Sequence, residues 1–184
     1  MKPGEKLLKR DKPAYVLDAT ATIHLAKITM LNLTLEICNA YITREVYAEA
    51  VERGGAHPDA LVIKDAIESG RLKVYDIKDK RLLEALLRHP EIHVGEAETI
   101  TAARELGGLA VIDEKEARVI ANLYKVKTAP GCLFLLFRLL KLRKITINEA
   151  EETLEKLLTS GLYLDPLTLL TARKKLRAYT SEKD

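Results

Sequence analysis

The sequence has no tryptophan, no glutamine and only two cysteines in its 184 residues. Cys38 and Cys132 are far apart and do not have the spacing of a metal motif, which argues against a disulfide framework and a cysteine zinc site. We expect both to fill core. No apolar run approaches the ~18 residues of a membrane span, and the charged first residues do not resemble a signal peptide. We therefore expect a cytoplasmic protein that does not contact membranes.

Neither sign of charge dominates. There are 30 basic and 27 acidic residues, a net charge of +3, so most charged side chains should form a mixed, solvated surface. This balance is compatible with a nucleic-acid partner but does not require one. With 31% charged residues and no glutamine, the composition resembles that of thermophile proteins. The length and the 47% hydrophobic share fit one domain with its own core.

Short apolar runs alternate with amphipathic segments through residue 128, which predicts an α/β fold with a mostly parallel sheet and helices on both faces. Residues 131–180 have helical patterns only, and the apolar run 132–140 is either core or a protein interface. We expect a polar lead-in at 1–13, one domain at 14–180 and a tail at 181–184. The expected strands are 15–17, 40–42, 72–75, 109–112 and 126–128.

Several helix boundaries are also marked in the sequence. Thr146 and Glu149 have the spacing of a capping box, and Asp165 precedes a proline, which indicates a helix start. Asp113 and Glu116 have the same spacing, so a helix is expected to begin at Asp113. In the helix after residue 43, α-helical spacing predicts Val46, Ala50 and Arg53 on one face, with Glu49 at its edge.

Acidic residues follow two of the expected strands. Asp18 comes directly after 15–17, and Asp113 and Glu114 come directly after 109–112. In a parallel sheet the carboxyl ends of strands line the crevice where ligands bind, so these carboxylates form a candidate site for a hard cation. Helix capping explains Asp18 and Asp113 equally well. For Glu49, which stands on an expected helix, a solvated acidic surface is the alternative. Helical spacing places Glu96 closer to the packed side of its helix than Glu98.

Four segments in this order resemble the PIN domain, in particular the bacterial and archaeal branch near VapC-type toxins. They are YVLDAT (15–20), ITREVYAEA (42–50), VGEAETITAARELG (94–107) and LAVIDEKEAR (109–118). The resemblance extends over roughly residues 14 to 180. It implies a three-layer α/β/α fold whose clustered carboxylates hold Mg²⁺ or Mn²⁺ and hydrolyse phosphodiester bonds in RNA.

The resemblance also implies roles for single residues. The four acids of the family correspond to Asp18, Glu49, Glu96 and Asp113, with Glu98 as an alternative to Glu96 and Glu114 as an accessory acid. Glutamate stands at the third position and at 114, where many relatives have aspartate. Asp18 and Asp113 are expected to contact metal, and the other acids to complete the shell or orient water. The candidates for contact with RNA are Thr20, Lys115 and Arg118, with helix capping as the alternative for Thr20 and a solvated helix face for Lys115 and Arg118.

The implied function is that of a metal-dependent endoribonuclease, with RNA as substrate. The toxin half of a toxin–antitoxin pair, inhibited by a small antitoxin protein, is one form of this function, and a homodimer is expected from relatives. A non-catalytic PIN-like module that binds RNA or protein is the alternative. Two basic groups, at 138–144 and 173–177, are either RNA contacts or solvated helix faces. For His93 we expect packing or surface exposure and not catalysis.

Overall fold

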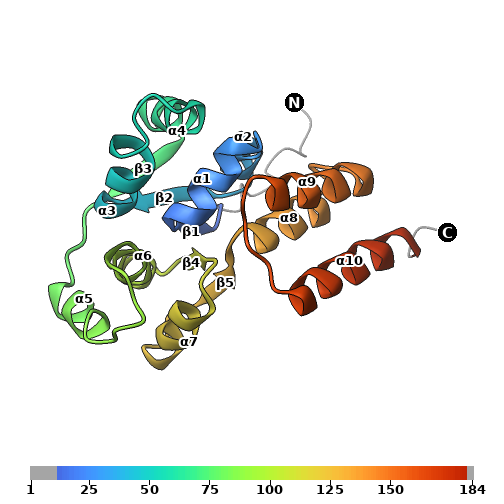
Figure 1. Ribbon diagram of the computed structural model, residues 1–184. Helices are drawn as coiled ribbons and strands as arrows, with labels where there is room; N and C mark the ends of the chain where they lie inside the picture. The colour runs from blue at the N-terminus through green and yellow to red at the C-terminus, as the bar shows by residue number, and fades with distance from the viewer. Residues whose placement is uncertain (1–11, 182–184) are drawn as a thin grey trace, which may run out of the picture.

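Five parallel strands form one sheet in the order β3-β2-β1-β4-β5 (Figure 1). The computed structural model describes residues 12–181, so most of the expected lead-in and tail lies outside the described residues. The strands are β1 (Ala14–Leu17), β2 (Asn39–Thr43), β3 (Leu72–Tyr75), β4 (Leu109–Ile112) and β5 (Thr128–Pro130). The helices are α1 (Ala19–Lys27), α2 (Leu31–Ile37), α3 (Arg44–Tyr47), the π-helix η1 (Ala48–Glu52), α4 (Pro58–Glu68), α5 (Lys80–Leu86), α6 (Val94–Glu105), α7 (Lys115–Leu123), α8 (Gly131–Lys141), α9 (Ile147–Thr159) and α10 (Pro166–Ser181).

Both faces of the sheet are buried under helices. Successive side chains of a strand point to opposite faces, so a strand contributes to both cores. In β1, Leu17 packs into a core with α1, α2, α4, α8 and α9, whereas Val16 packs into a second core with α5, α6 and α7. In β4, Val111 belongs to the first core and Ile112 to the second. The result is helices on both sides of a parallel sheet, which confirms the predicted α/β fold.

Most strand and helix predictions are confirmed, some with shifted ends. β3 and β4 have the predicted bounds. Thr146 and Glu149 form the predicted capping box at the start of α9. The Asp165 carboxylate accepts hydrogen bonds from the backbone N–H groups of Leu167 and Thr168 at the start of α10, each 3.0 Å long.

The fifth strand lies two residues later than predicted, at Thr128–Pro130 instead of 126–128. The reason is how α7 ends. Lys125 adopts a left-handed backbone with φ of 59°, and the Val126 N–H donates to the Ala121 carbonyl at 3.1 Å. Residues 124–126 therefore finish the helix, as in other helix ends with a left-handed residue, and only then can the chain pair with β4. The short helix α2 was not predicted.

The segment after β2 is not a regular α-helix. It begins as α3 and continues as the π-helix η1, in which the Arg53 N–H donates to the Ala48 carbonyl, five residues earlier, at 2.9 Å. Val46, Ala50 and Val51 are buried, whereas the Arg53 side chain is 63% exposed. The predicted position of Arg53 on the buried face is therefore wrong, since the wider turn rotates later residues.

The apolar run 132–140 proves to be core. Leu135, Leu136 and Leu139 of α8 are at most 2% exposed and pack in the first core. Within residues 12–181, no helix combines the length and the apolar character needed to cross a membrane.

Truncation of Leu135 to alanine tests the role of α8 in the core. Leu135→Ala leaves a cavity at a position with no exposed surface, so we expect the free energy of unfolding to fall by about 2–5 kcal/mol. Leu142→Ala is the matched control, because that side chain is 41% exposed, and should cost less than about 1 kcal/mol. Urea unfolding measures both, and equal losses would contradict the assignment of α8 to the core.

Candidate functional site

The order in which strands are added to the sheet reverses between β1 and β4. β2 and β3 lie on one side of this pair, and β5 lies on the other side. Crevices for ligands form at such a switch point, outside the carboxyl ends of the strands. Asp18 and Asp113 are the first residues after these two strands. The Asp18 N–H donates to the Val111 carbonyl at 3.1 Å, and the Asp113 N–H donates to Asp18 Oδ2 at 3.0 Å. Two segments 95 residues apart are thus joined at this point.

Asp18 is 4% exposed and accepts two backbone hydrogen bonds. Its Oδ1 accepts from the Ala21 N–H at 2.7 Å, so it is the N-cap of α1, as one interpretation of the sequence predicted. Its Oδ2 accepts from Asp113 instead of from its own helix. Oδ1 of this carboxylate therefore caps α1, and Oδ2 binds the segment after β4 across the switch point.

The Asp113 carboxylate faces the start of α8. The Cys132 N–H lies 3.2 Å from Oδ1 and 3.3 Å from Oδ2. A Cβ atom built on Gly131 would lie 2.0 Å from the carboxylate, so only glycine fits beside Asp113. The predicted capping box with Glu116 is wrong, because α7 begins at Lys115 after Glu114, and Asp113 binds α8 instead.

Glu49 and Glu96 come from η1 and α6, and the two elements meet at Gly95. A Cβ atom on Gly95 would lie 3.3 Å from Glu49 Oε1, so the start of α6 is close to this carboxylate. Glu96 is 8% exposed, and its Oε2 accepts from the His93 N–H at 2.8 Å. Glu49 is partly exposed and lies 3.7 Å from Arg53.

Beside these acids is an open cleft of about 410 Å³. It brings together Asp18, Thr20, Glu49, Glu96 and Glu114 from among the predicted residues, whereas the Asp113 carboxylate is turned toward Cys132 at its edge. The residues that line the cleft are Asp18, Ala19, Thr20, Glu49, Glu91, His93, Gly95, Glu96, Glu114 and Glu116.

Three predicted residues have other contacts. Glu98 Oε2 accepts from the Glu45 N–H at 3.0 Å, which ties α6 to the first turn of α3. Arg118 Nη1 donates to the carbonyl oxygens of Ile112 and Asp113 at 2.8 Å and 2.5 Å, so it braces the loop after β4. Lys115 is exposed on the first turn of α7.

His93 is exposed, as one interpretation of the sequence predicted, and it also lines the cleft. Two acids that line the cleft, Glu91 and Glu116, were not predicted. Their nearness to Glu96 and Glu114 in the sequence was the available signal. Glu91 lies in the loop that leads into α6, and its placement depends on the path of that loop.

A family model described as a PIN domain matches residues 14–178, which is most of the chain. The chain belongs to the PIN-domain family. PIN domains are generally nucleases, so the family indicates a nuclease-type function and RNA as the kind of molecule bound. No curated protein matches the sequence significantly.

Burial and mutual repulsion disfavour charge in this PIN-domain cleft. Burial, with the neighbouring charge of Asp113, raises the pKa of Asp18 to about 8 against the lowering effect of two backbone N–H groups. Burial raises the pKa of Glu96, with Glu114 and Glu49 adding to the effect. Burial also raises the pKa values of Glu49 and Asp113. A cation bound in the cleft would therefore stabilise the ionised form of these carboxylates.

The donor set fits a hard divalent cation in kind, but the described carboxylates do not form a finished ligand cage. All candidate donors are oxygens, which Mg²⁺ and Mn²⁺ prefer, and Mg²⁺ takes only one or two carboxylates directly and keeps several waters. Among residues 12–181, no three Asp, Glu, His or Cys side chains are arranged as a ready metal site. Asp18 and Glu96 already accept backbone hydrogen bonds, so a metal ion would share them with the protein.

The pH dependence of stability tests the burial of Asp18. In metal-free protein the unfolded chain loses this proton near pH 3.8, whereas the folded chain keeps it to about pH 8, so the free energy of unfolding falls as the pH rises between these values. Asp18→Asn cannot ionise but can still cap α1. We expect the thermal midpoint of the variant, relative to the wild type, to rise by at least about 3 °C between pH 5 and pH 8.

Glu155→Gln, at an exposed position on α9, is the control for this measurement and should show no such trend. Both variants are measured in a chelator. If the difference in thermal midpoint between the wild type and Asp18→Asn stays constant from pH 5 to pH 8, the interpretation is contradicted.

Proposed function

We propose that this PIN domain is an endoribonuclease that depends on Mg²⁺ or Mn²⁺ and hydrolyses phosphodiester bonds of RNA. One observation carries the proposal. Asp18, Glu49, Glu96 and Glu114, from four separate segments, line one cleft at the switch point of the sheet, with Asp113 bonded to Asp18 at its edge. Buried like charges cost stability, so their convergence calls for a functional reason.

The metal-holding residues in this proposal are Asp18, Glu49, Glu96, Asp113 and Glu114. Glu98 contributes indirectly, because it accepts a hydrogen bond from the Glu45 N–H at the start of α3. A bound divalent ion would compensate their charge and polarise the phosphate. The hydrogen bonds of Asp18 and Glu96 hold these carboxylates in fixed orientations, which reduces the reorganisation needed during the reaction. Glu49 is partly exposed and has a raised pKa, so it is suited to accept a proton from the attacking water.

Substrate contacts are proposed for Thr20 and Lys115, and a supporting role for Arg118. The Thr20 hydroxyl stands in the cleft beside Asp18 and is suited to donate to a phosphate oxygen. Lys115 extends from the first turn of α7, where a cation can reach the backbone of a bound strand. Arg118 acts indirectly in this proposal, because its Nη1 donates to two carbonyl oxygens of the loop that carries Asp113.

The third acid of the site is Glu96 in this proposal, and Glu98 is a positioning residue. Glu96 lines the cleft, whereas Glu98 accepts a hydrogen bond from the start of the segment that carries Glu49. The two residues therefore allow a matched comparison on one helix.

A VapC-type toxin function is the finer form of the proposal, and the sequence motifs are its support. A small antitoxin that covers the acidic cleft would inhibit the enzyme. A homodimer would use a surface other than the run 132–140, since that run packs inside a single chain.

Two observations favour a second candidate, a non-catalytic module that binds RNA or protein. The Asp113 carboxylate is bound to the start of α8, and the described acids do not form a ready metal site. Binding of RNA without cleavage at any divalent ion concentration would favour this candidate over the nuclease.

Cleavage of single-stranded RNA by the purified chain tests the nuclease. We expect cleavage with Mg²⁺ or Mn²⁺, none with EDTA, and a loss of at least about 100-fold in Asp18→Asn and Asp113→Asn, because each removes a charge from the site. All proteins are purified in the same way. Unchanged activity in both variants would show that the cleavage comes from a contaminant.

The comparison of Glu96→Gln with Glu98→Gln tests the assignment of the third acid. Glu96→Gln should lose activity by about 100-fold, since it removes a charge from the cleft. Glu98→Gln should keep activity within about threefold, because the amide oxygen still accepts from the Glu45 N–H. The reverse order would assign Glu98 to the site instead.

A further inference from the structure

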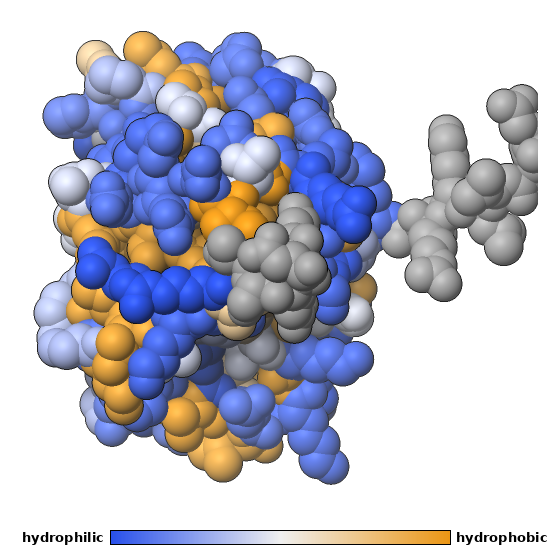
Figure 2. Space-filling view, turned by 90° about the vertical axis from the view of Figure 1, so that its right-hand side faces the viewer, coloured by the Kyte–Doolittle hydropathy of each residue, from blue (hydrophilic) through white to orange (hydrophobic). Residues whose placement is uncertain are grey.

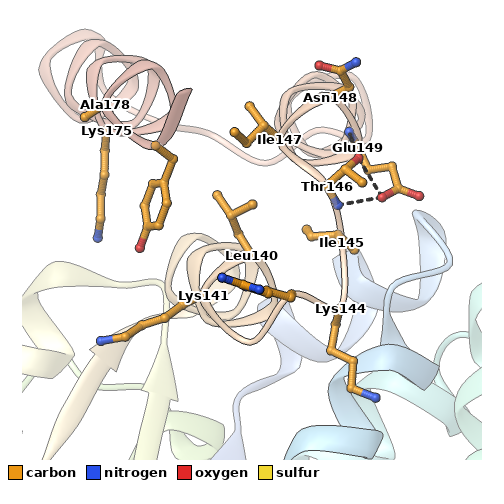
Figure 3. Close-up of a pocket in the computed structure, with 12 residues that line it drawn as sticks. Leu140, Lys141, Lys144, Ile145, Thr146, Ile147, Asn148, Glu149, Lys175 and Ala178 are labelled. Atoms are coloured by element: carbon orange, nitrogen blue, oxygen red, sulfur yellow. Dashed lines mark hydrogen bonds between the residues drawn. The ribbon is translucent and has the colours of Figure 1, made fainter. Parts of the chain in front are cut away.

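A second, larger hollow lies away from the acidic cleft. It is a groove of about 1000 Å³ between the end of α8, the turn into α9, and α10. Figure 3 shows Leu140 and Ile147 pointing into the space between the three helices, and Lys141 and Lys175 extending on one side of it. Figure 2 shows this side of the molecule, where apolar patches are exposed between hydrophilic side chains.

The charge of the groove is predominantly positive. Within the part of the chain that the structure describes, residues 12–181, Lys141, Arg143, Lys144 and Lys175 line it, against one acid, Glu149. Glu149 is engaged in the capping box of α9, where its Oε2 accepts from the Thr146 N–H at 2.6 Å. The groove therefore has a surplus of cations, so an anionic ligand complements it.

The four cations differ in how firmly they are bound to the protein. Lys144 pairs with Glu36 at 2.7 Å, and the Lys175 ammonium lies 4.2 Å from the centre of the Phe137 ring. Among residues 12–181, Lys141 and Arg143 form no ion pair with an acidic side chain. These two cations are available to an outside partner without loss of an internal ion pair.

Helix-end electrostatics do not account for this arrangement. Cations near the carboxyl end of a helix stabilise it, which would explain Lys141 and Arg143 at the end of α8. Lys175 comes from the middle of α10, a different helix that faces the same groove. Convergence of cations from two helices on one groove indicates a binding surface.

We infer that this groove is an accessory binding site for the single-stranded RNA that the proposed nuclease cleaves, an inference that rests on the proposed function. Single-strand sites combine cations for the phosphates with apolar or aromatic side chains against which bases pack. The groove supplies both, with Tyr179, Leu140 and Ile145 beside the cations. An acidic protein segment would also complement the cations, so polyglutamate is the competing ligand in the test.

Helix α8 connects the groove with the acidic cleft. Its first residues, Gly131 and Cys132, hold Asp113, and its last turn carries Leu140 and Lys141. Eleven helical residues span about 16 Å, so one strand can reach both places only if it extends several nucleotides beyond the cleaved bond. The groove should therefore increase the affinity for longer RNA and leave very short RNA unaffected.

RNA binding by a charge-neutralised variant tests the inference. Lys141→Gln with Arg143→Asn removes two cations, and asparagine tolerates the left-handed backbone of position 143, where φ is 55°. A fluorescein-labelled oligouridylate of about 20 nucleotides is titrated with the full chain in EDTA and followed by fluorescence anisotropy. We expect a Kd at least about fivefold higher and a salt dependence of log Kd weaker by about 1.4, or about 0.7 per lost phosphate contact.

Lys125→Asn with Lys127→Gln is the matched control. It removes two exposed lysines at the same spacing, the first also at a left-handed position with φ of 59°, and neither lines the groove. An equal loss of RNA binding in both double variants, or no loss in either, would overturn the inference. It would also be overturned if polyglutamate, and not RNA, depended on Lys141 and Arg143.

Binding in EDTA separates this inference from the nuclease proposal. If the chain cleaves no RNA but the groove variant alone binds RNA less tightly, the nuclease fails and the groove stands. If RNA is cleaved and the groove variant binds and cleaves as the wild type does, the groove fails and the nuclease stands.

Discussion

The hydrogen bond from the Asp113 N–H to the Asp18 carboxylate is the contact on which the site depends. It joins the residues that follow β1 and β4, the two central strands, where the sheet order reverses. Parallel pairing of Leu17 with Val111 fixes the two chain segments side by side, so that Asp18, one residue after Leu17, and Asp113, two residues after Val111, lie at the same edge. The sheet register therefore sets the separation of the acids, and the surrounding helices add Glu49 and Glu96.

The clustering of buried acids lowers the free energy of unfolding. Asp18 and Glu96 are almost fully buried and have raised pKa values, so the fold bears a cost in order to keep them together. The compensation within the protein is partial and comes from backbone N–H groups at the starts of α1, α6 and α8. These amide donors fix the carboxylates without neutralising them. The proposed RNA groove has the opposite electrostatic character, with cations left uncompensated at the far end of α8.

The sequence could predict what depends on local pattern. Alternating apolar runs gave the parallel sheet, and their ends marked Asp18 and Asp113, because an acid directly after a buried strand must lie at the sheet edge. It also indicated that Glu96 is closer to the packed side of its helix than Glu98. The direction of the Asp113 side chain was not predictable, since it depends on Cys132, which reaches it through β5 and the start of α8.

The π-helix η1 was the other feature beyond local pattern, and it determines where Glu49 points. One residue more than an α-helical turn contains is accommodated between Ala48 and Arg53. In this turn an i to i−5 hydrogen bond replaces the usual i to i−4 bond. Ala50 and Val51 in the turn are buried, and Arg53 after it is exposed to solvent. A shortening of this segment by a single residue would restore an ordinary helix with its backbone well bonded. The same change would shift the residues of this segment around the helix axis, so the length of the helical segment is linked to the position of Glu49 in the acidic cleft.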